Sequence, residues 1–294
     1  MVPRVSSSPD FGSPLGLADL VRAALAEDVG SGDVTTGATV PPDRHGTAQV
    51  IARAIGVISG TAAFTETYRQ VDAAVTVELP ARDGVAVEDG GLVAIARGRF
   101  ASLLVAERTA LNFLQRLSGV ATLAARFAHA VEGSHAQIVD TRKTTPGWRA
   151  LEKAAVRHGG GLNHRMGLYD AYLIKENHVA GAGGVEAALA AVSRHNDRSL
   201  PVEIEVRSPE EIEAVLASTH RPDRILCDNF DLDGLARAVR RIKSVERPPL
   251  VEASGNVTLA TVRAVAETGV DWISVGALTH SAPALDLSCR IDPA

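Results

Sequence analysis

The chain has 294 residues, of which 22% are charged and 46% hydrophobic, and its formal net charge is −5 at pH 7. A negative surface gives no reason to bind nucleic acid, while the apolar content is enough for a full core. Two cysteines, Cys227 and Cys289, form no metal-binding or disulfide pattern. Residues 1–14 lack the apolar segment of a signal peptide, and nothing approaches the roughly 18 uninterrupted apolar residues of a membrane helix. We therefore expect a cytoplasmic protein without membrane contacts.

The first third of the chain predicts a small α/β domain. Residues 1–16 are rich in Ser, Pro and Gly, and we expect them to be loosely attached. Apolar residues at helical spacing predict a helix over 17–28. Short β-favouring runs between Gly and Asp turns predict a small antiparallel or mixed sheet over 47–99.

A stretch with helical periodicity joins this region to the rest of the chain. We expect two helices, over 102–118 and 120–131, separated by Gly119. The sequence pattern changes after this stretch, which places a domain boundary here. The predicted divisions are a domain over 1–118, a domain over 119–278, and a C-terminal tail, 279–294, that packs on the first domain.

The second domain alternates short apolar strands with amphipathic helices. Such repetition implies parallel strands joined by right-handed crossovers. An incomplete (β/α) barrel of six or seven strands suits the pattern better than a full eight; a doubly wound open sheet is the alternative, but no Gly-rich dinucleotide fingerprint follows the first strand. The predicted strands are 137–139, 171–174, 202–206, 224–227, 250–253 and 272–275, and the predicted helices are 148–157, 185–194, 209–217, 232–242 and 259–267.

Residues that can do chemistry follow most of these strands. This favours the barrel, because barrels build their active sites from loops at the carboxyl ends of the strands. The residues at the strand ends are Asp140-Thr141-Arg142-Lys143, Lys175, Glu205, Asp228, Ser254-Gly255 and Gly276.

Basic residues gather in a few short segments. The chain has only four lysines, and two of them, Lys143 and Lys175, lie close in sequence to Arg142, His164 and Arg165. Like charges at one barrel mouth repel one another unless an anion joins them. The Arg fork suits carboxylates, and Lys supplies a point charge for phosphates. We expect a site for carboxylates or phosphates.

Two carboxylates, Glu205 and Asp228, stand at the ends of predicted strands, opposite the basic residues. Strand alternation puts Glu203 and Glu205 on one face. Glu205 and Asp228 could hold Mg²⁺ together with substrate phosphates, or stabilise positive charge that develops on a sugar carbon. Ion pairs with Lys143 and Lys175 in the empty protein are the alternative.

Glycines follow the last two predicted strands, in Ser254-Gly255-Asn256 and in Val275-Gly276-Ala277. Glycine lets backbone N–H groups approach a ligand, and a following helix N-terminus favours phosphate. Phosphate sites in barrels lie preferentially on these last units. Two ordinary βα turns are the alternative.

On the long helical stretch, Arg108 and Asn112 lie on the same side, opposite the apolar residues. By itself this pattern indicates a solvated helix face.

The segment Asp140-Thr141-Arg142-Lys143-Thr144-Thr145-Pro146-Gly147, followed by Asn163-His164-Arg165 and Lys175-Glu176-Asn177-His178, resembles the quinolinate phosphoribosyltransferase family, enzymes of NAD biosynthesis. The resemblance extends from residues 25–36 to residues 275–280. It implies an α/β fold with a smaller N-terminal α/β sandwich domain on an incomplete barrel, in a homodimer or higher oligomer. It also implies transfer of the phosphoribosyl group of phosphoribosyl pyrophosphate (PRPP) to quinolinate, giving nicotinate mononucleotide, pyrophosphate and CO₂.

The resemblance further implies a role for each site residue, with Mg²⁺ as the cofactor. The residues implied to hold the two carboxylates of quinolinate are Arg142, His164, Arg165, Lys175 and, from the neighbouring subunit, Arg108. The catalytic residues, which handle the pyrophosphate and ribose of PRPP, are Lys143, Glu205 and Asp228, of which Glu205 and Asp228 meet the Mg²⁺ largely through the substrate. The residues implied to bind the 5′-phosphate are Ser254, Gly255, Gly276 and Ala277.

Three positions depart from the family pattern: Glu176 where Asp is frequent, Asn256 where Gly is frequent, and Cys227 where an aliphatic residue is usual. None has a chemical role here, and Asn tolerates left-handed backbone angles.

A Schiff-base aldolase is a competing hypothesis, but nearby carboxylates would keep Lys143 or Lys175 protonated. A non-catalytic ligand sensor is another. Nicotinate is the rival substrate, and it lacks the second carboxylate.

Overall fold

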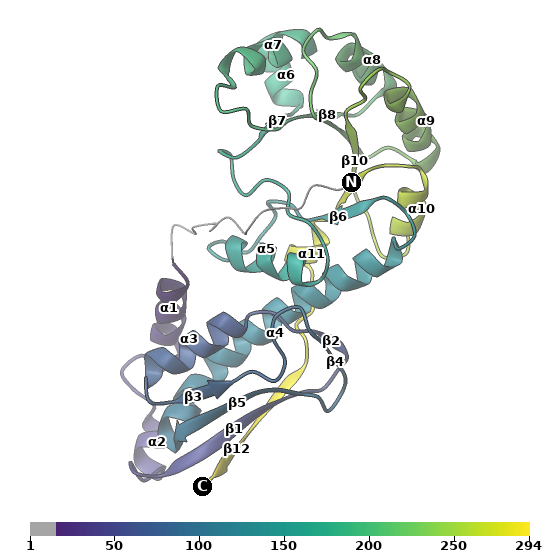
Figure 1. Cartoon of the computed structure of the whole chain (residues 1–294). Coiled ribbons are helices and arrows are strands. Elements are labelled where there is room, and N and C mark those ends of the chain that lie inside the picture. The colour runs from purple at the N-terminus through teal and green to yellow at the C-terminus, as the bar shows by residue number, and fades with distance from the viewer. Residues whose placement is uncertain (1–15) are drawn as a thin grey trace.

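The computed structural model describes residues 16–294, and Figure 1 shows them as two lobes connected through one long helix. Almost all of the segment predicted to be loosely attached therefore lies outside the described residues. Among the helices of residues 16–294, none is both long enough and apolar enough to cross a membrane.

The N-terminal lobe is built on an antiparallel sheet of four strands in the order β12-β1-β5-β3. Its last member comes from the C-terminus of the chain, which pairs with β1 (Figure 1). Helix α4 packs on the sheet through buried residues that include Leu103 and Leu114. The elements of this lobe are α1 Leu17–Val29, α2 Val34–Thr39, β1 His45–Ala52, β2 Gly56–Val57, α3 Thr61–Val71, β3 Thr76–Glu78, β4 Ala86–Val87, β5 Leu92–Arg99, α4 Phe100–Ala130 and β12 Leu287–Pro293.

Helix α3 corrects the prediction that residues 47–99 contain only strands and turns. The helix starts after Gly60, whose φ of 100° places it in the left-handed region. Ala63, Phe64 and Tyr68 recur at helical spacing and are all buried. The short β-favouring runs around this segment concealed that spacing in the sequence.

Helix α4 corrects a second prediction, because the two helices expected around Gly119 are one continuous helix. A glycine inside a helix costs about 1 kcal/mol relative to alanine. Here a Cβ atom at Gly119 would overlap the carbonyl oxygen of Pro283. Gly119 therefore allows the C-terminal segment around Pro283 to pack directly against the helix, and it does not end the helix.

The second lobe confirms the α/β fold with an incomplete barrel. Six parallel strands follow the order β6-β11-β10-β9-β8-β7, and helices cover the outside. In Figure 1 the ring of strands is open between β7 and β6. The elements are β6 Gln137–Val139, α5 Arg149–His158, β7 Tyr172–Ile174, α6 Glu176–Ala182, α7 Val185–His195, β8 Val202–Val206, α8 Pro209–Ala217, β9 Arg224–Asp228, α9 Leu232–Lys243, β10 Leu250–Ser254, α10 Val262–Glu267, β11 Trp272–Ser274 and α11 Ala277–His280.

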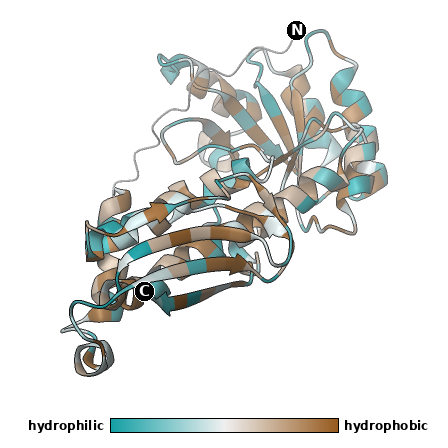
Figure 2. Cartoon of the chain, turned by 60° about the horizontal axis from the view of Figure 1, so that its bottom comes forward, coloured by the Kyte–Doolittle hydropathy of each residue, from teal (hydrophilic) through white to brown (hydrophobic). Residues whose placement is uncertain are grey.

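Strand alternation divides the barrel into two environments. One set of side chains, with Ile204, Ile225 and Ile273, is fully buried in the core under the helices. Figure 2 shows apolar residues on these strands and polar residues on the outer faces of the helices. The alternate set includes Glu203, Glu205 and Arg224 and fills the inside of the ring with polar groups, where barrels usually place branched apolar residues.

Candidate active site

A cavity of about 680 Å³ opens at the carboxyl ends of the barrel strands. It brings together every site residue predicted from this chain's own barrel domain. Arg108 is the exception, because it lies exposed on α4 in the N-terminal lobe, away from this cavity. The predicted residues that line the cavity are Arg142, Lys143, His164, Arg165, Lys175, Glu205, Asp228, Ser254, Gly255, Gly276 and Ala277.

The basic side of the cavity holds cations that lack sufficient counter-charge. The Nε atom of Arg142 is buried and has no hydrogen-bond partner. Arg165 donates to the carbonyl oxygen of Ala171 at 3.2 Å. Burial, and then the neighbouring guanidinium of Arg142, lower the pKa of Arg165 below its usual range. An anion bound between Arg142 and Arg165 would give the Arg142 Nε an acceptor and would offset the repulsion between the two guanidinium groups.

A buried ion pair fixes the loops that carry these cations. Asp140 and Lys153 form the pair, and both are almost fully buried. Asp140 also accepts the backbone N–H of His164 at 2.9 Å and the side-chain amide of Asn163 at 2.5 Å. Burial raises the pKa of Asp140 and lowers that of Lys153, so the charge of each depends on its partner. Asp140 and Asn163 therefore position the motif segments around them.

Helix α5 holds the same loops from the outside. Buried Glu152 accepts the N–H of Thr145 at 3.0 Å and its hydroxyl at 2.7 Å. Arg149 donates to the Thr144 hydroxyl at 3.0 Å and to the carbonyl oxygen of Met166 at 3.1 Å. The residues between the basic ones thus build the frame of the site.

The acidic side of the cavity is partly paired. Lys175 and Glu205 form an ion pair of 3.0 Å, as the alternative interpretation of these residues expected. Arg207 contacts Glu205 at 3.1 Å and Asp228 at 3.7 Å. Lys143, by contrast, is exposed and forms no ion pair with any residue in the described range 16–294. These contacts leave Lys143 free for a ligand.

The glycine loops owe their form to close contacts with other loops. Gly255 has a φ of 109°, and a Cβ atom there would overlap the side chain of Asn229. Asn256 adopts a φ of 47°, the left-handed conformation that asparagine tolerates. Helix α10 starts at Val262 and not at 259 as predicted, so no helix N-terminus lies directly beside Gly255. The expected help from a helix dipole is therefore absent at this loop.

At the bottom of the cavity, inside the barrel, lies a buried charged network that we call the floor. His164 Nε2 lies 2.9 Å from a carboxylate oxygen of Glu203 and 3.5 Å from one of Glu252. Arg224 contacts Glu252 at 3.1 Å, and its guanidinium carbon lies 3.6 Å from the ring centroid of Trp272. The floor residues are His164, Glu203, Arg224, Glu252 and Trp272.

The surroundings of the two nitrogens of His164 favour different protonation states of the ring. Burial lowers its pKa, but Glu203 and Glu252 outweigh burial and raise it to about 9. Nδ1 accepts the backbone N–H of Arg165 at 2.8 Å, which favours the neutral ring. In both states the proton on Nε2 lies between the ring and Glu203. Both nitrogens are thus engaged in the protein without ligand, and the quinolinate-binding role expected for His164, which lines the cavity, stays a prediction.

The carboxylates of the floor differ from each other in their surroundings. Burial raises the pKa of Glu203, against the opposing effect of His164. Burial would also raise that of Glu252, but His164 and Arg224 hold its pKa below the ordinary value. The two acids and His164 have the donor types of a metal site, but Arg224 already supplies the cation there.

Several residues that line the cavity were not predicted for the site. Strand alternation could have found two of them, since Arg207 lies two residues beyond Glu205 and Glu252 two residues before Ser254. His280 lies one turn beyond Gly276. Besides Asn256, the polar cavity residues that were not predicted for the site are Thr141, Arg207, Asn229, Glu252, Thr258, Ser274 and His280.

Comparisons with known proteins identify a family that covers most of the chain. Models of the quinolinate phosphoribosyl transferase N-terminal and C-terminal domains match residues 33–118 and 120–290. The chain is 42% identical over 293 residues to quinolinate phosphoribosyltransferase (decarboxylating) 2b, mitochondrial, of Nicotiana tabacum, covering 94% of this chain and 82% of that protein. It is 40% identical over 267 residues to a probable nicotinate-nucleotide pyrophosphorylase (carboxylating) of Synechocystis, covering 91% and 90%. The crystal structure of NadC from Streptococcus pyogenes superposes with a TM-score of 0.89 at 37% identity, covering 98% and 100%.

Proposed function

The chain belongs to the quinolinate phosphoribosyltransferase family, and we propose that it transfers the phosphoribosyl group of PRPP to quinolinate with decarboxylation, forming nicotinate mononucleotide, pyrophosphate and CO₂. The observation that carries this proposal is the division of one cavity into a basic side and an acidic side. Two strongly anionic substrates can approach each other there, because the cations reduce their repulsion.

On the basic side, Arg142, Arg165 and Lys175 bind the two carboxylates of quinolinate. Support comes from the unpartnered Nε of Arg142 and the lowered pKa of Arg165, which an anion would correct. Nicotinate has one carboxylate and would leave part of this charge uncompensated. His164 supports the pocket from the floor, since both of its nitrogens are engaged.

On the acidic side, Glu205 and Asp228 face the pyrophosphate and ribose of PRPP, and Lys143 reaches the same substrate from its place beside Gly276. Glu205 and Asp228 offer the hard oxygen donors that Mg²⁺ prefers, typically alongside substrate phosphates, and so fit that cofactor. When bound, Mg²⁺ neutralises charge on the pyrophosphate. The loops of Ser254-Gly255 and Gly276-Ala277 bind the 5′-phosphate at the opposite end.

These residues divide the reaction between them. As the bond from the ribose carbon to pyrophosphate breaks, positive charge develops on that carbon, and Glu205 and Asp228 stabilise it. The quinolinate nitrogen forms the new bond to the same carbon. Its positive charge then eases loss of the adjacent carboxylate as CO₂, whose bonding electrons stay on the ring carbon until a proton replaces the carboxylate.

We also propose a homodimer in which Arg108 of the partner subunit completes the quinolinate pocket. The open side of the barrel exposes Leu168 and Tyr169, with 74% and 62% of their surface accessible, and a partner would cover them. Mixing inactive Arg108→Ala and Lys143→Ala subunits should restore part of the activity. Verified heterodimers without activity would rule out a shared site.

A cytoplasmic location belongs to the same proposal. A bacterial relative exists, whereas the tobacco 2b protein is named mitochondrial and the Arabidopsis protein chloroplastic. Fractionation of the source cells would test the location directly, and recovery of the protein in an organelle would overturn it.

The test of the reaction uses purified protein with quinolinate, PRPP and Mg²⁺. We expect nicotinate mononucleotide and CO₂ in equal amounts, and no product when nicotinate replaces quinolinate. Binding of both substrates without product would instead indicate a sensor, and product from nicotinate would overturn the substrate assignment. Borohydride trapping of a lysine adduct would indicate an aldolase.

A further inference from the structure

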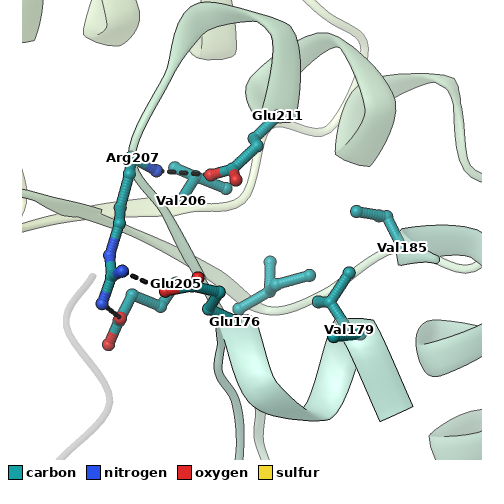
Figure 3. Close-up of a pocket in the computed structure, with 9 residues that line it drawn as sticks. Glu176, Val179, Val185, Glu205, Val206, Arg207 and Glu211 are labelled. Atoms are coloured by element: carbon teal, nitrogen blue, oxygen red, sulfur yellow. Dashed lines mark hydrogen bonds and ion pairs between the residues drawn. The ribbon is translucent and has the colours of Figure 1, made fainter. Parts of the chain in front are cut away.

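Arg207 is the cavity residue with the most carboxylate contacts. It directly follows β8, and its side chain reaches Glu176, Glu205 and Asp228. Its backbone N–H donates to the Glu211 carboxylate at 2.6 Å, which holds the backbone of Arg207 in place. Figure 3 shows the guanidinium between Glu205 and Glu176. These carboxylates raise the pKa of Arg207, with Glu176 as the largest cause.

Two of these carboxylates are the ones that should meet a magnesium-bound substrate. Arg207 therefore occupies, in the free protein, a position between Glu205 and Asp228 that a cation would take. A magnesium-bound substrate would give both acids a new positive partner, and the guanidinium of Arg207 could then leave them. Phosphate oxygens then become its best available acceptors, because the planar Arg fork suits bidentate contacts.

The side chain has room to make this exchange. Half of it is exposed, with 51% of its surface accessible. It lines the main cavity and also a smaller neighbouring cavity of about 190 Å³ behind Glu205 (Figure 3). A change of partner therefore requires no movement of the core.

Strand order decides which phosphate lies within its reach. The neighbouring strands β11, β10, β9 and β8 lie side by side in that order. The loops proposed for the 5′-phosphate follow β11 and β10, and Asp228 ends β9. Arg207 follows β8, at the far end of this row. A PRPP molecule laid along the row places its 5′-phosphate at one end and its pyrophosphate beside Arg207.

We propose that Arg207 binds the pyrophosphate group of PRPP and that Glu205 and Asp228 hold it ready in the free enzyme. This inference rests on the proposed function, because it takes PRPP as the substrate. Its alternative is a purely structural ion pair that ties α6 to β8 through Glu176.

The test compares Arg207→Ala and Arg207→Lys with a matched control, Arg241→Ala. Arg241 also makes a double contact with a carboxylate, Glu213, and is similarly exposed, but lies outside the cavity. Calorimetry with Mg²⁺ and pyrophosphate measures binding without turnover, and steady-state kinetics gives the two KM values separately.

We expect Arg207→Ala to weaken pyrophosphate binding and to raise the KM for PRPP by about 10- to 100-fold, the usual range for a charged hydrogen bond. The KM for quinolinate should change less than about twofold, and Arg207→Lys should recover part of the loss. Unchanged pyrophosphate affinity, or equal loss for both substrates, would overturn the inference. Wild-type protein that binds pyrophosphate but forms no product would overturn the proposed function and not this contact.

Discussion

The mouth and the floor of the barrel contain the same kinds of charged residue, arranged differently. At the mouth, which we define as Arg142, Lys143, Arg165 and Lys175, cations lie near one another, and the buried Nε of Arg142 has no partner. On the floor, cations meet carboxylates, and Glu203 and Glu252 are almost fully buried. On the floor every charge has an oppositely charged partner, although Glu203 Oε1, Arg224 Nε and Glu252 Oε1 accept or donate no hydrogen bond. Among the mouth cations, Lys175 alone pairs with a carboxylate within residues 16–294, so the mouth carries repulsion that a ligand can relieve.

This difference predicts different consequences when a charge is removed. Breaking a buried ion pair leaves an uncompensated charge and costs about 3–5 kcal/mol. Removing one of several like charges relieves repulsion and costs little stability. Variants on the floor should therefore affect folding, and variants at the mouth should affect binding and catalysis.

The largest effect on stability is expected from Glu252→Leu. This change removes the carboxylate that contacts the buried side chains of Arg224 and His164. We expect a loss of about 3–5 kcal/mol in the free energy of unfolding, measured by urea denaturation. The control is Glu267→Leu, because Glu267 pairs with Arg263 at 2.8 Å on the surface and should cost at most about 1 kcal/mol. Equal losses for the two variants would contradict the distinction between floor and surface.

The next effect concerns Glu205, on the acidic side of the cavity. Glu205→Gln keeps the shape of the side chain but removes the charge that stabilises the ribose carbon. We expect kcat to fall by about 100- to 1,000-fold, with little change in the KM for quinolinate. Single-turnover kinetics would measure the step itself. A variant with normal kcat would show that Glu205 has no part in the chemistry.

A smaller effect is expected from pH. The pKa of His164 rises from 6.5 to about 9 in the folded protein, so its contribution is complete below about pH 6.5 and is lost as the pH rises through about 9. The loss should be on the order of 1–3 kcal/mol, reduced by the backbone N–H on Nδ1. Urea denaturation across this range measures it. Glu203→Gln should flatten the profile, and a flat wild-type profile would show that the ring is neutral throughout.

The barrel could be predicted from the sequence because each strand–helix unit carries its own local signal. The strand over 202–206 and the helix over 209–217 match the structure residue for residue. The continuity of α4 could not be predicted in this way. Gly119 is explained only by its contact with Pro283, and that contact joins distant parts of the chain.

The same limit applies to the site. Residues at strand ends could be predicted to meet, since parallel strands end at one edge. The floor depends on register, which places Glu203 beside Arg224 and Glu252 beside Trp272. No single strand contains that information. The engagement of both His164 nitrogens follows from the same packing and was therefore missed.

The most direct test of the distinction between mouth and floor is the thermal stability of Arg142→Ala with and without quinolinate. A ligand that binds only the folded state raises Tm, so quinolinate should raise that of the wild-type protein. For Arg142→Ala we predict an unchanged or higher Tm without ligand and little or no rise with it. A lower Tm without ligand, together with the full rise on adding quinolinate, would show that Arg142 stabilises the fold and does not bind the substrate.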